Sequence, residues 1–429
     1  MRRMQSNGIS LHRISLFGAF VVFTGLMSLA SAQVPVKNPG DWPQWRGPDR
    51  TGQSRETGLL TSWPEGGPPV VWKSNDVGAA YSSVSVADGR VYTQGNVNDA
   101  ETVLCLDEKT GEILWSVTHE GAPRAYRHRR GDGPRGSPTV DGDRVYVVAG
   151  NGDVSCFEVA SGKSLWHRHF VKDFGGRVPS WGFSESPLID GDHVIVTPGG
   201  PQGAIVALNK MNGEVVWKSK DVHDRAHYSS AIIAEVEGVR QIIQFTSDRV
   251  VGLDASDGRL LWSYRGSANR TANVCTPIYS DGHVFTSSAY GTGGGLVKLT
   301  KSGDKFEATE VYFEMSMANH HGGIVLVDGY LYGFGSNALI CMNFLTGEIM
   351  WRNRSVGKGS LCYANGHLYC LGEEQSVGLV AANPKEYVEK GRFELPDSGK
   401  PSWAHPVVAN GHLYLRDQSS LTCYDVRAK

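Results

Sequence analysis

The hydrophobic and polar positions of this chain repeat one short pattern, with a period of about 45 residues. Each copy begins with a run of alternating hydrophobic and polar residues that ends in an Asp-Gly or Asn-Gly pair. A second alternating run follows this pair. A third alternating run then leads into the sequence Asp-x-x-Thr-Gly-Glu-x-x-Trp. Clear copies run from Asp88 to Trp115 and from Asp328 to Trp351. Alternation is typical of half-buried strands, and the Asx-Gly pair is typical of a two-residue hairpin turn. The pattern therefore predicts a series of four-stranded antiparallel units.

The first hairpin turn of the unit occurs eight times, at Asp88-Gly89, Asp141-Gly142, Asp190-Gly191, Glu237-Gly238, Asp281-Gly282, Asp328-Gly329, Asn365-Gly366 and Asn410-Gly411. The last unit ends near Tyr424 without a fourth strand, whereas the run Val70-Val71-Trp72 forms a strand with no unit before it. We expect this first strand to complete the last unit, because such closure leaves only short, protected sheet edges. The predicted fold class is all-β: an eight-bladed β-propeller over residues 70–429, with the last blade closed by an N-terminal strand.

The first residues are predicted to be a signal peptide over residues 1–32. Arginines precede an apolar run from Ile14 to Leu29, and Ala30-Ser31-Ala32 follows as a small-x-small cleavage site. The alternative is an uncleaved anchor helix, because about 17 apolar residues are close to the shortest bilayer span. Cleavage after Ala32 implies a periplasmic or secreted protein with no remaining transmembrane span.

The net charge and the cysteine positions argue against a nucleic-acid-binding protein and against a disulfide-linked fold. The formal charge of −2 argues against a nucleic-acid partner, which usually selects a strongly basic domain. The chain has seven cysteines, and Cys105, Cys156, Cys341 and Cys423 occupy the same position in the third strand of four different units. Packed sheets stand about 10 Å apart, whereas a disulfide needs Cα atoms within about 7 Å. We therefore expect buried thiols rather than a disulfide framework.

The Asp-x-x-Thr-Gly-x-x-x-Trp phrase resembles the tryptophan-docking motif of pyrroloquinoline quinone (PQQ) dehydrogenases and of the outer-membrane assembly lipoprotein BamB. The resemblance covers nearly the whole mature chain. It implies that the tryptophan of each unit packs between neighbouring blades, here Trp72, Trp115, Trp166, Trp217, Trp262 and Trp351. The lead-in around Trp42 and Trp45 resembles that of secreted bacterial PQQ-like repeat proteins, and we interpret residues 33–69 as a strap packed on the ring.

The segments before the innermost strands do not repeat, and in a propeller they line one mouth of the central channel. Polar and aromatic groups converging on one opening predict a ligand-binding site. Its expected residues are Tyr81, Arg127, Arg129, Arg130, Arg135, Trp181, Glu185, His227, Arg270, Asn273, His320, His321, Lys358, Trp403 and His405. Guanidinium groups pair with carboxylate, sulfate or phosphate, so an anionic small molecule, a polysaccharide or a partner protein is expected. The alternative is a solvated loop surface without a ligand.

The resemblance to quinoprotein enzymes also implies a calcium ion and PQQ at the mouth. Glu185 and Asn273 stand where calcium ligands are expected, with Arg270 nearby. Where a further carboxylate is needed, the chain has Asn319-His320-His321, and it lacks both a vicinal Cys pair and a Cys-x-x-Cys-His haem motif. Zinc sites built from His223, Asp224 and His227, or from His320 and His321, lack the spacing of known zinc motifs.

The sequence therefore favours an exported, non-catalytic binding propeller with no catalytic residue, metal or cofactor assigned. A PQQ- and calcium-dependent dehydrogenase that oxidises alcohols is the first alternative. A BamB-like envelope assembly scaffold is the second, although no cysteine near the cleavage site is available for a lipid anchor.

Overall fold

The structure, a computed structural model, describes Met1, residues 36–120 and residues 124–428. The predicted signal peptide therefore lies almost entirely outside the described residues. The chain divides into two compact units, Met1–Ser31 and Ala32–Lys429, and every described helix and strand belongs to the second. None of the helices in the described part of the chain has the length and apolar character needed to cross a bilayer.

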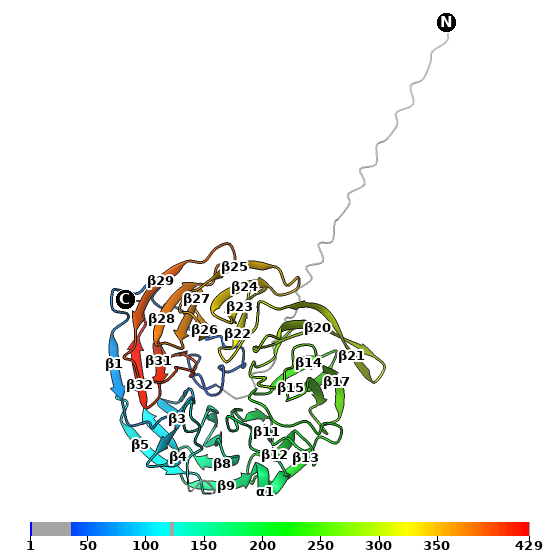
Figure 1. Cartoon of the computed structure of the whole chain (residues 1–429), viewed down its shortest axis with the longest axis horizontal. Coiled ribbons are helices and arrows are strands. Elements are labelled where there is room, and N and C mark those ends of the chain that lie inside the picture. The colour runs from blue at the N-terminus through cyan, green and yellow to red at the C-terminus, as the bar shows by residue number, and fades with distance from the viewer. Residues whose placement is uncertain (2–35, 121–123, 429) are drawn as a thin grey trace. The chain divides into compact units, whose positions relative to one another are not determined.

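The second unit is a ring of eight four-stranded antiparallel sheets, which confirms the predicted fold class (Figure 1). Blades 1 and 2 contain β2 (Ser85–Ala87), β3 (Arg90–Val97), β4 (Ala100–Asp107), β5 (Ile113–Thr118), β6 (Thr139–Asp141), β7 (Arg144–Val148), β8 (Asp153–Glu158) and β9 (Ser164–His169). Blades 3 and 4 contain β10 (Leu188–Asp190), β11 (His193–Val196), β12 (Val206–Asn209), β13 (Val215–Lys218), β14 (Ile232–Val236), β15 (Val239–Phe245), β16 (Val250–Asp254) and β17 (Leu260–Tyr264).

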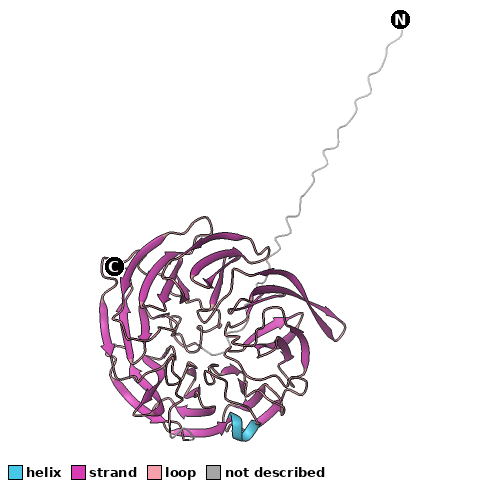
Figure 2. Ribbon diagram, viewed as in Figure 1, coloured by secondary structure: helices cyan, strands magenta, loops and turns pink. Residues whose placement is uncertain are grey.

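Blades 5 and 6 contain β18 (Ile278–Ser280), β19 (His283–Ser288), β20 (Gly293–Ser302), β21 (Lys305–Glu314), β22 (Ile324–Val327), β23 (Tyr330–Gly335), β24 (Ala338–Asn343) and β25 (Ile349–Asn353). Blades 7 and 8 contain β26 (Gly359–Ala364), β27 (His367–Gly372), β28 (Ser376–Ala381), β29 (Glu389–Glu394), β30 (Val407–Ala409), β31 (His412–Asp417), β32 (Ser420–Asp425) and β1 (Val70–Ser74). A short helix, α1 (Phe170–Phe174), follows β9 (Figure 2).

The ring closes where β1 pairs with β32. Trp72 lies opposite Cys423, and Lys73 lies opposite Thr422, in antiparallel register. The two ends of the propeller thus share blade 8, as the unmatched first strand predicts.

The Asx-Gly turns explain the hairpins within each blade. Asp88 and Gly89 both have positive φ, 51° and 74°, as a two-residue turn with the right strand twist requires.

Tryptophans of the repeat join neighbouring blades. Trp115 of blade 1 donates from Nε1 to the Val159 carbonyl of blade 2 at 3.0 Å, and its ring lies against Gly162. Corresponding bonds link Trp72 to Glu108, Trp166 to Lys210, Trp217 to Ala255 and Trp351 to Asn383. A Cβ on Gly162 would lie 2.7 Å from the Trp115 ring, so this turn position admits only glycine without rearrangement.

Unlike these tryptophans, Trp262 does not donate its hydrogen bond to the next blade. Its Nε1 donates to Gln241 Oε1 of its own blade at 2.7 Å. The reason lies in blade 5, whose long β20–β21 hairpin has no Asp-x-x-Thr-Gly turn to receive it. Blade 5 in turn closes with Tyr312, whose hydroxyl donates to the Phe344 carbonyl of blade 6 at 2.8 Å.

The lead-in segment lies inside the ring, which differs from the expected strap on its surface. Residues 41–54, which we call the plug, cross the central channel. They bond to the inner strands of blades 1, 2, 6 and 7 and to the residues just before the inner strands of blades 3, 4 and 5. Trp42 exchanges two backbone hydrogen bonds with Val86 of blade 1, and the Pro43 carbonyl accepts from Val140 of blade 2. The plug therefore fills the channel that a bare ring would leave open.

Two arginines hold the plug. Arg50 is almost fully buried and donates to the carbonyls of Ser186 and Ala231, between blades 3 and 4, at 3.2 and 2.9 Å. Arg46 donates to the Thr51 carbonyl at 2.8 Å and to the Ile324 carbonyl of blade 6. Because a buried guanidinium needs such acceptors to offset its lost hydration, these bonds fix where the plug sits.

The remaining lead-in leaves the channel and returns along the outside of blades 7 and 8. Leu60 donates its N–H to the Val426 carbonyl at 2.7 Å. Trp63 packs edge-on against Phe393 and lies against Gly391, where blade 7 lacks a tryptophan of its own. This second half therefore packs on the outside of the ring. All seven cysteines are free and buried.

Candidate functional site

The loops that precede the innermost strands form a cavity of about 510 Å³, here called the mouth cavity. Trp45 of the plug lines it, and its Nε1 donates to Thr276 Oγ1 at 2.9 Å. The plug therefore closes the inner end of the cavity, which turns a channel into a pocket. Such closure lets a ligand lose most of its contact with water.

Many of the residues expected from sequence line the mouth cavity together. They are Tyr81, Arg129, Arg130, Arg135, Trp181, His320, His321, Lys358, Trp403 and His405. Sequence reasoning missed Trp45, Tyr228 and Tyr290, which also line it. Trp45 is outside the expected set because the lead-in was interpreted as a strap on the ring, with a binding role for Trp42 and Trp45 as the alternative. Tyr290 stands in a β19–β20 turn, and no expected site segment included that turn.

Arg127, His227 and Arg270 lie elsewhere. Arg127 lines a neighbouring surface groove, and its guanidinium pairs with Asp99 at 2.6 Å. His227 Nδ1 accepts the N–H of Asn273 at 3.1 Å, and burial lowers the pKa of this imidazole to about 4. Arg270 is exposed and is not among the residues that line the mouth cavity.

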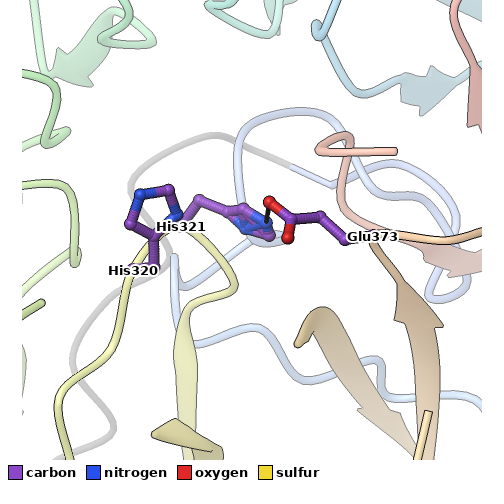
Figure 3. Close-up of side chains that lie close together, drawn as sticks. All are labelled: His320, His321 and Glu373. Atoms are coloured by element: carbon purple, nitrogen blue, oxygen red, sulfur yellow. Dashed lines mark ion pairs between the residues drawn. The ribbon is translucent and has the colours of Figure 1, made fainter. Parts of the chain in front are cut away.

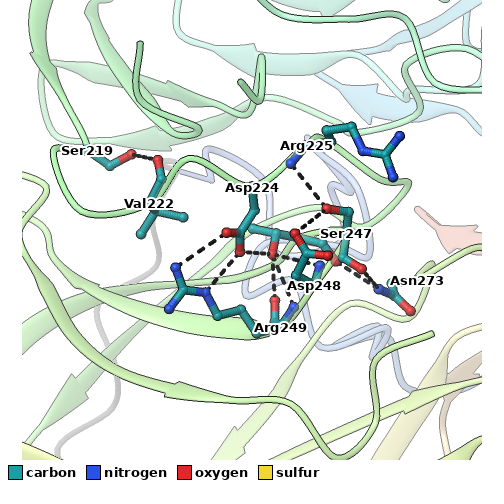
Figure 4. Close-up of polar contacts among 9 residues, drawn as sticks. Ser219, Val222, Asp224, Arg225, Ser247, Asp248, Arg249 and Asn273 are labelled. Atoms are coloured by element: carbon teal, nitrogen blue, oxygen red, sulfur yellow. Dashed lines mark hydrogen bonds and ion pairs between the residues drawn. The ribbon is translucent and has the colours of Figure 1, made fainter. Parts of the chain in front are cut away.

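Glu185 and Asn273, the expected calcium ligands, are buried behind the cavity wall. Glu185 accepts the N–H of Thr197 at 2.5 Å, and burial raises the pKa of its carboxyl to about 7. The Asn273 amide donates to the carbonyls of Thr246 and Ser247 at 2.8 and 3.0 Å, as part of a loop network (Figure 4). Its carbonyl oxygen accepts from Asn269. Both side chains therefore serve the fold in this arrangement.

The same hydrogen-bond network includes Asp224, which the sequence analysis considered as a zinc ligand together with His223 and His227. Arg249 Nε donates to Asp224 Oδ2 at 3.0 Å, and Thr246 Oγ1 donates to the same oxygen at 2.7 Å (Figure 4). The neighbouring His223 is exposed. The structure therefore gives Asp224 a partner within the protein and does not bring these residues together around a common point.

Arg135 organises the basic loop of the mouth cavity. Its guanidinium lies 5.3 Å from the ring centres of both Tyr81 and Tyr126 and donates to the carbonyls of Gly131 and Gly133 at 3.0 and 2.9 Å. Burial lowers the pKa of Arg135. These contacts fix the turn between His128 and Gly133, and Arg129 and Arg130 project from that turn with exposed side chains.

The histidines of the mouth cavity carry little charge. Burial lowers the pKa of His320 to about 4 and that of His405 to about 3, so both imidazoles are neutral at physiological pH. Lys358 and Glu373 form an ion pair with Nζ 2.9 Å from Oε1. The charge that remains available to a ligand is therefore positive and comes from the arginines.

Aromatic rings form the rest of the wall. Tyr81 and Trp403 have ring centres 4.6 Å apart, and Trp181 and Tyr228 have ring centres 5.5 Å apart. Flat apolar faces beside charged groups suit a ligand that has a ring and an anionic substituent.

The residues present do not fit a calcium ion with PQQ. Calcium takes six to eight oxygen ligands, often from carboxylates and amides. Glu185 and Asn273 are turned to partners within the protein. No step of a quinone reaction can be derived from this site.

Comparison with known proteins places the chain in a family. The family model described as outer membrane protein assembly factor BamB matches residues 99–332. The BamB of Yersinia pestis is 22% identical over 331 residues, which cover 71% of this chain and 75% of that protein. The BamB of Bordetella pertussis is 28% identical over 161 residues, which cover 37% of each chain.

Solved structures share the fold. The quinohemoprotein alcohol dehydrogenase of Comamonas testosteroni has a TM-score of 0.64 at 13% identity and covers 91% of this chain and 81% of its own. BamB from Moraxella catarrhalis has a TM-score of 0.54 at 15% identity and covers 77% of this chain and 95% of its own. At such identities the likeness concerns the fold alone. The match of the family model, together with the repeats and the ring, shows that the chain belongs to the PQQ-like β-propeller family described as outer membrane protein assembly factor BamB.

Proposed function

We propose that this protein is an exported, non-catalytic propeller that binds an anionic ligand with a ring-shaped body in the mouth cavity. Acidic and sulfated sugars are the ligand class that fits best. The observation that carries the proposal is the combination of free guanidinium groups and aromatic walls above a closed floor. Arginine forks pair with carboxylate and sulfate, and sugar rings pack on flat aromatic faces.

Residence in the cell envelope is part of this proposal. The apolar run and the Ala-x-Ala site of the sequence support export. The names of the BamB relatives connect those proteins with the assembly of outer membrane proteins. A periplasmic location is therefore the form of export that we favour over secretion.

A panel of ligands tests the function. Purified protein is titrated calorimetrically with glucuronate and sulfated oligosaccharides, with their neutral counterparts, and with PQQ plus calcium. We expect the charged sugars to bind at least about tenfold more tightly than the neutral ones, because each charge-assisted hydrogen bond contributes about 1.5–3 kcal/mol. Equal affinity for neutral and charged sugars would contradict the proposal. Calcium-dependent PQQ binding with dye-linked alcohol oxidation would establish the dehydrogenase instead.

A second candidate is an envelope assembly scaffold whose partner inserts an acidic segment into the same opening. The names of the BamB relatives favour it, as does the exposure of Arg129 and Arg130 at the rim. Affinity capture from native envelope with the wild type and with a variant that lacks both arginines separates the candidates. A protein retained only by the wild type supports the scaffold.

A further inference from the structure

Three possible metal ligands lie together beside the mouth cavity, and two of them, His320 and His321, line it. His320 and His321 belong to the segment before β22 of blade 6, and Glu373 lies in the turn between β27 and β28 of blade 7. One ligand atom from each lies within 4.8 Å of the other two, and His321 points toward Glu373 (Figure 3). The distance from His321 Nε2 to Glu373 Oε1 is 3.8 Å.

Three of the four imidazole nitrogens of this cluster lack partners within the described chain. Both ring nitrogens of His321 and Nδ1 of His320 are buried without a hydrogen bond. His320 Nε2, by contrast, bonds to the Tyr290 hydroxyl at 2.8 Å. A buried polar atom without a partner costs about 1–3 kcal/mol, so three in one cluster require an explanation. A bound metal ion would accept the lone pair of one nitrogen from each ring.

The donor set and its spacing select the kind of ion. Two nitrogens and one carboxylate suit Zn²⁺ and similar transition metals, whereas Ca²⁺ and Mg²⁺ take oxygen ligands. Two ligands bonded to Zn²⁺ at about 2.1 Å and at a tetrahedral angle stand about 3.4 Å apart. The 3.8 Å between His321 Nε2 and Glu373 Oε1 is close to this value. All three ligand atoms lie within 4.8 Å of one another, so the cluster must tighten around an ion when it binds.

The ammonium group of Lys358 competes with a metal ion for the carboxylate of Glu373. Its ammonium lies 2.9 Å from Glu373 Oε1, and Trp403 Nε1 donates to the same oxygen at 2.5 Å. A divalent ion bound to the carboxylate repels this ammonium, so Lys358 must turn away into the cavity when the ion binds.

We propose that His320, His321 and Glu373 bind one Zn²⁺ or similar transition-metal ion, with a further coordination position open to the mouth cavity. The open position would take water or an anionic group of a ligand, as in zinc sites with three protein ligands. The proposal concerns the ion alone and holds whether or not a sugar binds in the cavity.

Metal titration of the full-length mature protein tests the site. After treatment with a chelator, the protein is titrated with Zn²⁺ by calorimetry and with Co²⁺ by visible spectroscopy. We expect one ion per chain and intense Co²⁺ bands typical of four or five ligands. H321A and E373Q should each weaken Zn²⁺ binding at least about tenfold, in line with the loss of a ligand or its support. K358M should strengthen it several-fold, because the competing cation is gone.

His223→Ala is the matched control, because His223 is exposed and lies outside the cluster. Circular dichroism and thermal melting show whether each variant is folded, and E373Q keeps an acceptor for Trp403 if H321A unfolds the loop. Absence of stoichiometric binding, or an affinity that H321A and E373Q leave unchanged while H223A lowers it, would overturn the proposal.

Discussion

Replacing Arg50 by alanine is expected to lower the free energy of unfolding by about 3–5 kcal/mol, because each buried acceptor left without a partner costs about 1–3 kcal/mol. The guanidinium donates to the carbonyls of Ser186, Pro187 and Ala231 and to Gln44 Oε1. Alanine leaves these buried acceptors without a partner and leaves a void where the long side chain was. Guanidinium chloride unfolding, followed by tryptophan fluorescence, measures the loss.

Arg55→Ala is the control for this prediction. Arg55 belongs to the same lead-in segment, but its pair with Asp49 is exposed, with side-chain exposures of 49% and 33%. Exposed ion pairs contribute about 0–1 kcal/mol, so this variant should unfold close to the wild type. Equal and small effects of both substitutions would mean that Arg50 does not anchor the plug inside the ring.

Removing Arg129 and Arg130 together is expected to weaken binding of an anionic ligand by about 100-fold. Each arginine lines the mouth cavity with an exposed guanidinium, and one charge-assisted hydrogen bond from each, at about 1.5 kcal/mol, corresponds to about tenfold. Anilinonaphthalenesulfonate is a suitable probe, because its sulfonate is always ionised, its rings match the aromatic wall, and its fluorescence reports binding.

Arg127→Ala provides the matched control, because its guanidinium is paired with Asp99 and lies in the neighbouring groove. We expect this variant to bind the probe within about twofold of the wild type, as for a screened surface charge. If Arg127→Ala weakens binding as much as the double substitution does, a general surface potential attracts the probe, and the mouth cavity is not its site.

Much of the fold follows from local rules in the sequence. Asx-Gly pairs need the positive φ that a two-residue hairpin provides, and the Thr-Gly turn leaves room for the tryptophan of the preceding blade. The count of hairpins and the unmatched strand at Val70 therefore predicted eight blades and their closure. Trp262 departs from the pattern because its receptor turn is missing from the next blade, which is itself visible in the degenerate Ser302-Gly303 turn.

The plug could not be predicted in the same way. Residues 41–54 have no strand or helix periodicity, and their partners are far apart in sequence, with Arg50 bonding to Ser186 and Ala231 across 136 and 181 positions. Nothing local distinguishes a segment that fills a channel from one that lies on the surface. The burial of Arg46 and Arg50 follows from the tertiary structure alone.

Only part of the candidate site could be predicted from the sequence. Position within the repeat identifies which loops reach the mouth, but the direction of a side chain depends on its neighbours. Arg127 and Arg130 are three residues apart in one loop, yet one pairs with Asp99 outside the cavity and the other lines it. Glu185 and Asn273 turn inward, because backbone N–H and carbonyl groups of adjacent loops need their hydrogen bonds.

Hydrogen exchange of the plug measures the central claim most directly, because the mouth cavity has a closed floor only if residues 41–54 lie inside the ring. The N–H groups of Trp42, Gly52 and Ser54 bond to backbone carbonyls at 2.8, 2.8 and 2.7 Å. The structure therefore predicts that peptides covering the plug exchange as slowly as the inner strands β2 and β22. Exchange within seconds, as for an exposed loop, would contradict it.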